Sequence, residues 1–243
     1  MHGQVLRSFP IVTLLSALPA PSRRDMIPPV KRPDGPEGQP TELKSYDEVY
    51  AELPLLHPTP RSWAELAASR LPEFLADHAV CEQQVAMYGL SLAGYYPDDA
   101  ELVERAAALA AEEVQHFRRV VAILTKRGWP LGGRRKNVWA QSLRARIVLG
   151  REPMTKVDRL LFGALVEARS CERFTRLLEE IDDPEVVHLL ADLGPAERRH
   201  WEMFYRLAGR NTDEQVLAAR FQGWREFEAD LARGLGTSPA VHG

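Results

Sequence analysis

The sequence contains two copies of a pattern that is typical of metal sites, in which one glutamate is followed 30 or 31 residues later by a Glu-x-x-His pair. Four-helix bundles bind two iron or manganese ions with this ligand set, because two helices supply one glutamate each and two supply a Glu-x-x-His pair. Within a pair, the two side chains lie on one helix face and can address the same cavity. Ligands without a thiolate favour iron or manganese over structural zinc. The candidate ligands are Glu82, Glu113, His116, Glu167, Glu197 and His200.

Distance from the turn decides between two glutamates of the second predicted hairpin. Glu197 lies 14 residues after Asp183, about 21 Å along a helix axis, and a facing ligand must lie at the same depth. Glu167, 16 residues before Asp183, meets this condition, and the first hairpin has matching distances. The similarity of EARSCE to DHAVCE points instead to Glu172, which would lie roughly 7 Å too close to the turn. Because ligands must converge within about 2 Å of a metal, we expect Glu167 to be the ligand.

A third Glu-x-x-His pair, Glu185 with His188, is interpreted as a chance match. Its glutamate lies in the first turn of the predicted helix, where a carboxylate is favoured by the helix dipole. His188 and His200 are 12 residues apart, so His188 lies about 120° around the helix from the candidate ligand.

The pattern of apolar residues, turns and caps predicts an all-α protein with a ferritin-like four-helix bundle, extra flanking helices and a long crossover between the second and third bundle helices (the B–C crossover). The two predicted hairpins resemble each other, which suggests an internal duplication. The expected bundle helices span about 72–93, 99–127, 156–180 and 184–208, with a shorter helical piece at 138–149 in the crossover 128–154 and a last amphipathic segment at 213–233.

Composition and charge bound the remaining organisation. The chain has 243 residues and a net charge of −3, which gives no overall signal for nucleic-acid binding. Residues 1–60 are expected to be a disordered or extended tail, 61–234 the di-iron domain and 235–243 a C-terminal tail. A capping box is expected at Ser62 to Glu65, at the start of the ordered part.

The compartment is expected to be the cytoplasm. Both cysteines, Cys81 and Cys171, lie in helical patterns outside any Cys-x-x-Cys pair, which suits a reducing environment. No stretch is long enough to span a membrane. The apolar run 9–20 is a poor secretory signal, and we interpret it as a tail that could lie upstream of a start at Met26.

Four strings, DHAVCE, EEVQHF, GALVEARSCERF and AERRHWEMFY, resemble the bacterial tRNA 2-methylthio-isopentenyladenosine hydroxylases, the MiaE family. The resemblance covers about residues 62–210. It implies a ferritin-like, non-haem di-iron monooxygenase in which the six candidate residues bind iron. It also implies a reaction that uses O2 and two electrons from an external donor, of the reductase or ferredoxin type, to hydroxylate the isopentenyl group on adenosine 37 of tRNA.

The crossover carries a weaker signal for RNA binding. From Lys126 to Lys156 there are nine basic residues against one acidic residue, with Trp129 and Trp139 interleaved. Such a segment could bind phosphates and stack on bases, although a solvated helix face is the alternative. Candidate tRNA-binding residues are Arg134, Arg135, Lys136, Arg144 and Arg146.

Other functions share this architecture, because fold alone does not fix function. They are iron storage or detoxification, a di-iron oxidase acting on another substrate, and a binding module that has lost its metal. Aromatic residues beside the ligands, such as Tyr88 and Phe204, could line a prenyl pocket or simply form the bundle core.

Overall fold

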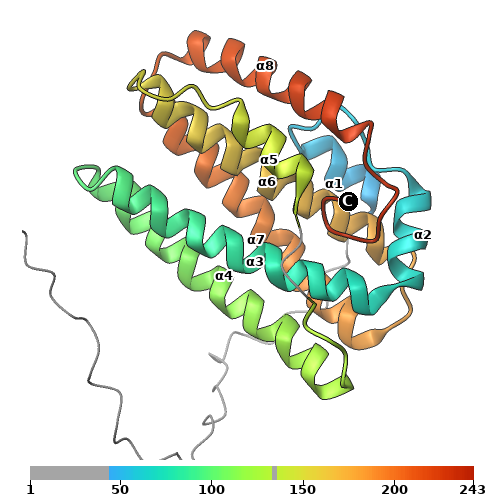
Figure 1. The fold of residues 1–243 in the computed structure, drawn as a ribbon. Helices are drawn as coiled ribbons and strands as arrows, with labels where there is room; N and C mark the ends of the chain where they lie inside the picture. Colours follow the sequence, from blue (N-terminus) through green and yellow to red (C-terminus); the bar gives the residue numbers. More distant parts are fainter. Residues whose placement is uncertain (1–43, 133–135) are drawn as a thin grey trace, which may run out of the picture. The chain divides into compact units, whose positions relative to one another are not determined.

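Four long helices form the centre of the computed structural model, which describes residues 44–132 and 136–243 (Figure 1). They are arranged as two antiparallel hairpins, α3 with α4 and α6 with α7, joined by a long crossover that contains α5. This connectivity confirms the predicted ferritin-like bundle. In chain order the helices are α1 (Tyr46–Glu52), α2 (Arg61–Ser69), α3 (Leu71–Tyr95), α4 (Ala100–Arg127), α5 (Val138–Ala145), α6 (Met154–Leu178), α7 (Pro184–Gly209) and α8 (Glu214–Ala232).

Local sequence signals set the ends of the bundle helices. The side chain of Asp99 accepts a hydrogen bond from the Leu102 amide and caps α4, which ends at Gly128 with a φ of 66°. Glycine adopts this left-handed conformation without steric cost. Asp183 caps α7 in the same way, and Pro184 occupies the first turn, where its missing amide hydrogen is not needed. Both short turns therefore lie where the spacing argument placed them.

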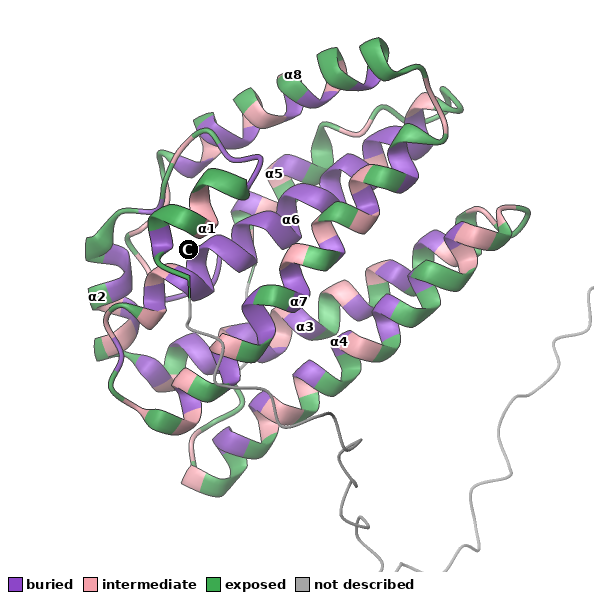
Figure 2. Cartoon of the chain, turned by 180° about the vertical axis from the view of Figure 1, so that it is seen from behind, coloured by how far each residue is buried: buried purple, intermediate pink, exposed green. Residues whose placement is uncertain are grey.

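The helix α6 is the buried centre of the fold, because α1, α2, α5, α7 and α8 all pack against it. Almost all its residues are buried, whereas α4 and α8 each keep a face in solvent (Figure 2). Two hydrophobic clusters fill the interior around it. Among the described residues, none of the helices combines the length and apolar character that a membrane span requires.

Residues 44–60 differ from the predicted disordered or extended tail. The helix α1 lies here, and both Tyr46 and Thr59 are buried. Their hydroxyl groups and the Thr59 amide donate to the carboxylate of Glu172 on α6. The composition of the segment gives no indication of these contacts. Residues 1–43 lie outside the described part of the chain.

Other boundaries also differ from the predictions. The capping box at Ser62 is wrong, because α2 begins at Arg61, and Pro60, two residues before Ser62, occupies the cap position without a side-chain hydrogen bond. The helical piece predicted to reach Leu149 ends at Ala145. Within the predicted C-terminal tail, Val241 is fully buried. Its amide donates to the Asp77 side chain on α3, and its carbonyl accepts from the Arg173 side chain on α6.

A buried ionic network ties α8 and residues 44–60 to α6. Arg169 donates to Glu228 at 2.9 and 3.0 Å and to Glu172 at 3.0 Å, and all three side chains are at most 1% exposed. Each carboxylate is therefore compensated by a guanidinium or hydroxyl donor. The network also explains why Glu172 is not available as a metal ligand.

Replacing Arg169 with Met should lower the free energy of unfolding by about 3–5 kcal/mol, because two buried carboxylates lose their shared cation. Urea denaturation followed by circular dichroism measures this change. The control is Arg118→Met, which removes an exposed arginine bonded to Gln115 on its own helix and should cost at most about 0.5 kcal/mol. Similar losses in the two variants would contradict a stabilising role for the network.

Candidate metal centre

The six predicted ligands converge in the middle of the bundle, and all of them are buried. α3 and α6 each supply one glutamate, and α4 and α7 each supply a Glu-x-x-His pair. They form two groups of four whose candidate ligand atoms lie within 4.8 Å of one another, and Glu113 and Glu197 belong to both. The first group is Glu82, Glu113, His116 and Glu197, and the second is Glu113, Glu167, Glu197 and His200.

Both imidazoles turn the Nδ1 atom toward the carboxylates. His116 Nδ1 lies 3.3 Å from Glu113 and 3.7 Å from both Glu82 and Glu197. His200 Nδ1 lies 2.8 Å from Glu113 Oε1 and 3.6 Å from Glu197 Oε2. The rings are 6.1 Å apart between centroids, so each can serve its own metal position.

Several buried atoms of the site lack a hydrogen-bond partner among the described residues. They are Glu113 Oε1, Glu197 Oε1 and His200 Nδ1. His200 Nδ1 and Glu113 Oε1 are close, but their orientation does not satisfy hydrogen-bond geometry. Buried polar atoms left without partners are costly, and a cation bound between them would satisfy all three. The donor set therefore fits a metal site.

The pKa shifts within the cluster also fit a metal site. Burial and the neighbouring Glu82 raise the pKa of Glu113, and burial together with a hydrogen bond to Glu197 raises the pKa of Glu167 well above its ordinary value. Burial opposes a charge on His116, yet hydrogen bonds to Glu113 and Glu82 raise its pKa to about 10. Without a metal the cluster holds protons to limit carboxylate repulsion. Two divalent cations would balance four carboxylates and displace those protons.

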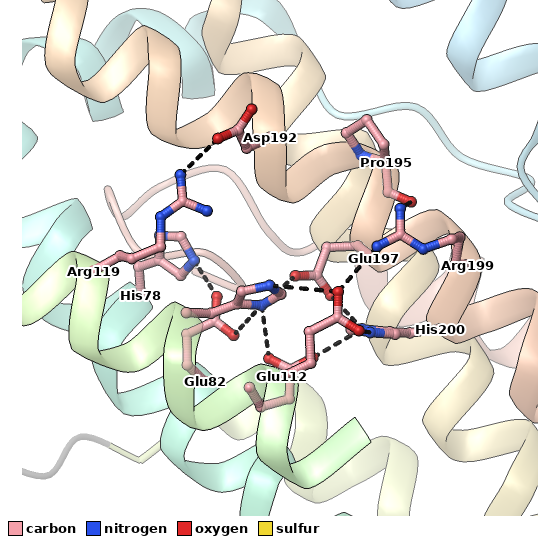
Figure 3. Close-up of polar contacts among 11 residues, drawn as sticks. His78, Glu82, Glu112, Arg119, Asp192, Pro195, Glu197, Arg199 and His200 are labelled. Atoms are coloured by element: carbon pink, nitrogen blue, oxygen red, sulfur yellow. Dashed lines mark hydrogen bonds and ion pairs between the residues drawn. The ribbon is translucent and has the colours of Figure 1, made fainter. Parts of the chain in front are cut away.

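Two further residues orient the predicted ligands, and the sequence did not identify them. Glu112 accepts from His200 Nε2 at 3.1 Å and is held by Arg199 at 2.9 Å (Figure 3). His78 Nε2 is bonded to Glu82. A ligating histidine commonly donates its other ring nitrogen to a carboxylate, which fixes its tautomer and orientation.

Three other charged residues close to the predicted ligands in the sequence have different partners. Asp192 binds Arg119 at 2.8 Å, Arg169 belongs to the buried ionic network, and Asp77 accepts from the Val241 amide. The only positional signal for the actual pair was weak: Glu112 lies four residues before His116 and directly before a ligand, and His78 lies four residues before Glu82.

The third Glu-x-x-His pair lies away from the cluster. The His188 side chain is 75% exposed and lies 3.7 Å from Asp192, while Glu185 pairs with Lys126 and Arg127. Neither residue belongs to the two ligand groups among the described residues.

A cavity of about 960 Å³ runs between α3, the crossover with α5, and α6, and it reaches the predicted ligand Glu167. Met87, Tyr88 and Phe162 contribute apolar wall, and Lys136 and Arg144 of the predicted RNA-binding set also line it. Arg146 instead stacks on Trp224 and Phe227. Arg134 and Arg135 lie outside the described residues. Of the aromatic residues after His200, Phe204 is buried in the core.

The sequence matches the family model described as tRNA-(MS2IO6A)-hydroxylase (MiaE) over residues 49–243. The chain belongs to the MiaE family. A Pseudomonas putida relative named tRNA 2-(methylsulfanyl)-N6-isopentenyladenosine(37) hydroxylase is 36% identical over 174 residues, covering 72% of this chain and 84% of the relative. A Salmonella typhimurium protein of the same name is 28% identical over 229 residues, covering 74% of this chain and 84% of that protein.

One solved structure is also similar to this chain. It is a Synechococcus protein described as having aldehyde deformylating oxygenase activity, with a TM-score of 0.73 and 31% identity. The match covers 77% of this MiaE chain and 94% of that chain. The fold and the buried Glu/His cluster therefore both indicate a metal site, as the sequence predicted.

Replacing His200 with Ala should abolish binding at one of two Fe²⁺ positions, because the second ligand group loses its only imidazole. Anaerobic equilibrium dialysis with Fe²⁺ measures the stoichiometry. Metal should also stabilise the wild-type protein by about 2.7 kcal/mol at a free concentration one hundred times Kd. His188→Ala, which removes the exposed histidine of the third pair, is the matched control and should bind as wild type does. Equal metal loss in both variants would contradict this assignment.

Proposed function

We propose that this chain is a di-iron, O2-dependent tRNA hydroxylase that oxidises the isopentenyl group of the modified adenosine 37, with the six clustered side chains as iron ligands. The observation that carries the proposal is the buried ligand cluster reached by a large cavity at Glu167, in a chain that belongs to the MiaE family. With tRNA as the substrate, we expect the reaction to take place in the cytoplasm.

The bound irons would supply the activation of O2 for attack on a C–H bond of the isopentenyl group. In the overall reaction one oxygen atom enters the C–H bond and the other leaves as water. Two electrons come from an external donor of the reductase or ferredoxin type, together with two protons. The protein holds the ligands in place through Glu112 and His78 and keeps the cluster out of water.

The cavity has the size and lining expected for a prenylated base. Ligand pockets commonly enclose about 300–1,000 Å³ with mostly apolar walls and a few polar groups. Its α3 wall is uncharged, since no acidic or basic residue occurs between Glu82 and Asp98. On the crossover wall, the side-chain amides of Asn137 and Gln141 line the cavity together with the cationic side chains of Lys136 and Arg144. We infer that the apolar wall contacts the base and its prenyl group, while Lys136 and Arg144 contact phosphates.

Deleting the gene should remove hydroxylated prenyl-adenosine from total tRNA and leave its unhydroxylated precursor. Mass spectrometry of tRNA nucleosides measures both, and restoration by the wild-type gene but not by a Glu197→Ala variant ties the loss to the metal cluster. An unchanged nucleoside profile would contradict the proposed substrate. It would favour the second candidate, an oxygenase acting on another substrate, which the likeness to the Synechococcus protein supports.

The double variant Lys136→Ala with Arg144→Ala should bind tRNA more weakly and with a shallower salt dependence. Two lost phosphate contacts reduce the slope of log K against log salt by about 1.4 to 1.8 in total. Fluorescence anisotropy with labelled tRNA from 50 to 200 mM salt provides the measurement. The control is Arg105→Ala, an exposed arginine on α4 that does not line the cavity. Wild-type affinity in the double variant would refute the phosphate contacts.

A further inference from the structure

The two halves of the metal cluster have unlike surroundings, and His78 is the clearest difference. This histidine is fully buried on α3, one turn before the ligand Glu82, and its Nε2 atom is bonded to a Glu82 carboxylate oxygen. Its Nδ1 atom is buried without a partner among the described residues. The proton therefore belongs on Nε2, which donates to the carboxylate.

Aromatic packing fixes the His78 ring. Its centroid lies 4.6 Å from that of Phe174 and 5.7 Å from that of Phe74, and both phenyl rings are buried. Packing against two buried phenyl rings restricts rotation of the imidazole, so the Nε2–H group is held toward Glu82. One Glu82 oxygen is thus occupied, and the other faces His116 at 3.7 Å.

The second hairpin has no counterpart to His78. The residue one turn before Glu167 is Gly163, which has no side chain that could donate to the ligand. A methyl group at this position would lie 2.9 Å from the ring of Phe204, so the close packing itself favours glycine. Gly163, Val166 and Glu167 all line the large cavity, whereas His78 and Glu82 do not.

We propose that the two metal positions are unequal: His78 is a positioning residue that makes the Glu82–His116 position rigid and closed, while the Glu167–His200 position opens on the cavity and faces the substrate. The proposal rests on the proposed function, since it assumes that both positions bind metal. Orienting partners of metal ligands commonly change affinity by 10–100-fold when they are removed. The closed position should accordingly bind more tightly and exchange more slowly than the open one.

The first test is anaerobic titration of the metal-free protein with Co²⁺, followed by calorimetry and visible absorption. The wild-type protein should show two successive binding steps. His78→Phe keeps the aromatic packing but removes the donor, and it should weaken the tighter step 10–100-fold while leaving the other within about twofold. His78→Gln, which retains a donor, should restore most of the lost affinity.

The outcomes distinguish a failure of the proposed inequality from a failure of the proposed function. Two equal steps in the wild-type protein, or equal weakening of both steps in His78→Phe, would overturn the inequality and leave the proposed function intact. Absence of any binding to the wild-type protein would instead overturn the proposed function. Thermal melting of the metal-free variants shows whether His78→Phe remains folded. If it does not, His78→Leu, which is smaller and also lacks a donor, provides the test.

The second test concerns the open side of the site. Removal of Co²⁺ by excess EDTA should be biphasic, with the fast phase from the position that faces the cavity. Val166→Phe narrows the cavity beside Glu167 and should slow the fast phase severalfold without changing the slow one. A single phase in the wild-type protein, or a slow phase that changes instead, would show that the cavity does not lead to one metal.

Discussion

Repulsion among four carboxylates held out of water is the constraint on which this structure depends. A bundle gains nothing in stability by gathering glutamates in its centre, because each must lose its hydration and face the others. Burial and neighbouring carboxylates raise the pKa of Glu113 and of Glu167, so bound protons or cations must limit that cost. The surrounding helices must therefore hold the cluster together against its own charge. The dense packing around α6 and the ionic network at Arg169 provide that support.

The architecture and the position of the ligands were accessible from the sequence because both depend on regular helix geometry. A rise of 1.5 Å per residue is enough to place Glu167 at the depth of Glu197 and to place Glu172 a turn and a half away. The structure agrees, since Glu172 is occupied by Tyr46, Thr59 and Arg169. The ligand identity remains a prediction that metal binding must test.

What escaped prediction depends on contacts between distant segments. Residues 44–60 look like a linker by composition, but buried hydrogen bonds from Tyr46 and Thr59 to Glu172 hold them on α6. Likewise, the sequence does not distinguish Glu112 from other surface residues or His78 from other core residues, because it does not give the rotation of each helix about its axis. Their roles follow from which neighbour each side chain faces, and spacing along one helix does not determine this.

Each predicted metal position draws its candidate ligands from both hairpins, because Glu113 and Glu197 belong to the two groups at once. A single hairpin of this kind carries half of a complete ligand set and can assemble a dinuclear centre only as a symmetric homodimer. Fusion of the two copies into one chain removes the requirement for symmetry. The first hairpin could then keep a histidine that donates a hydrogen bond to its glutamate. In the second hairpin the same position could become glycine and leave room for a large substrate. The contrast between His78 and Gly163 is what such a divergence would leave behind.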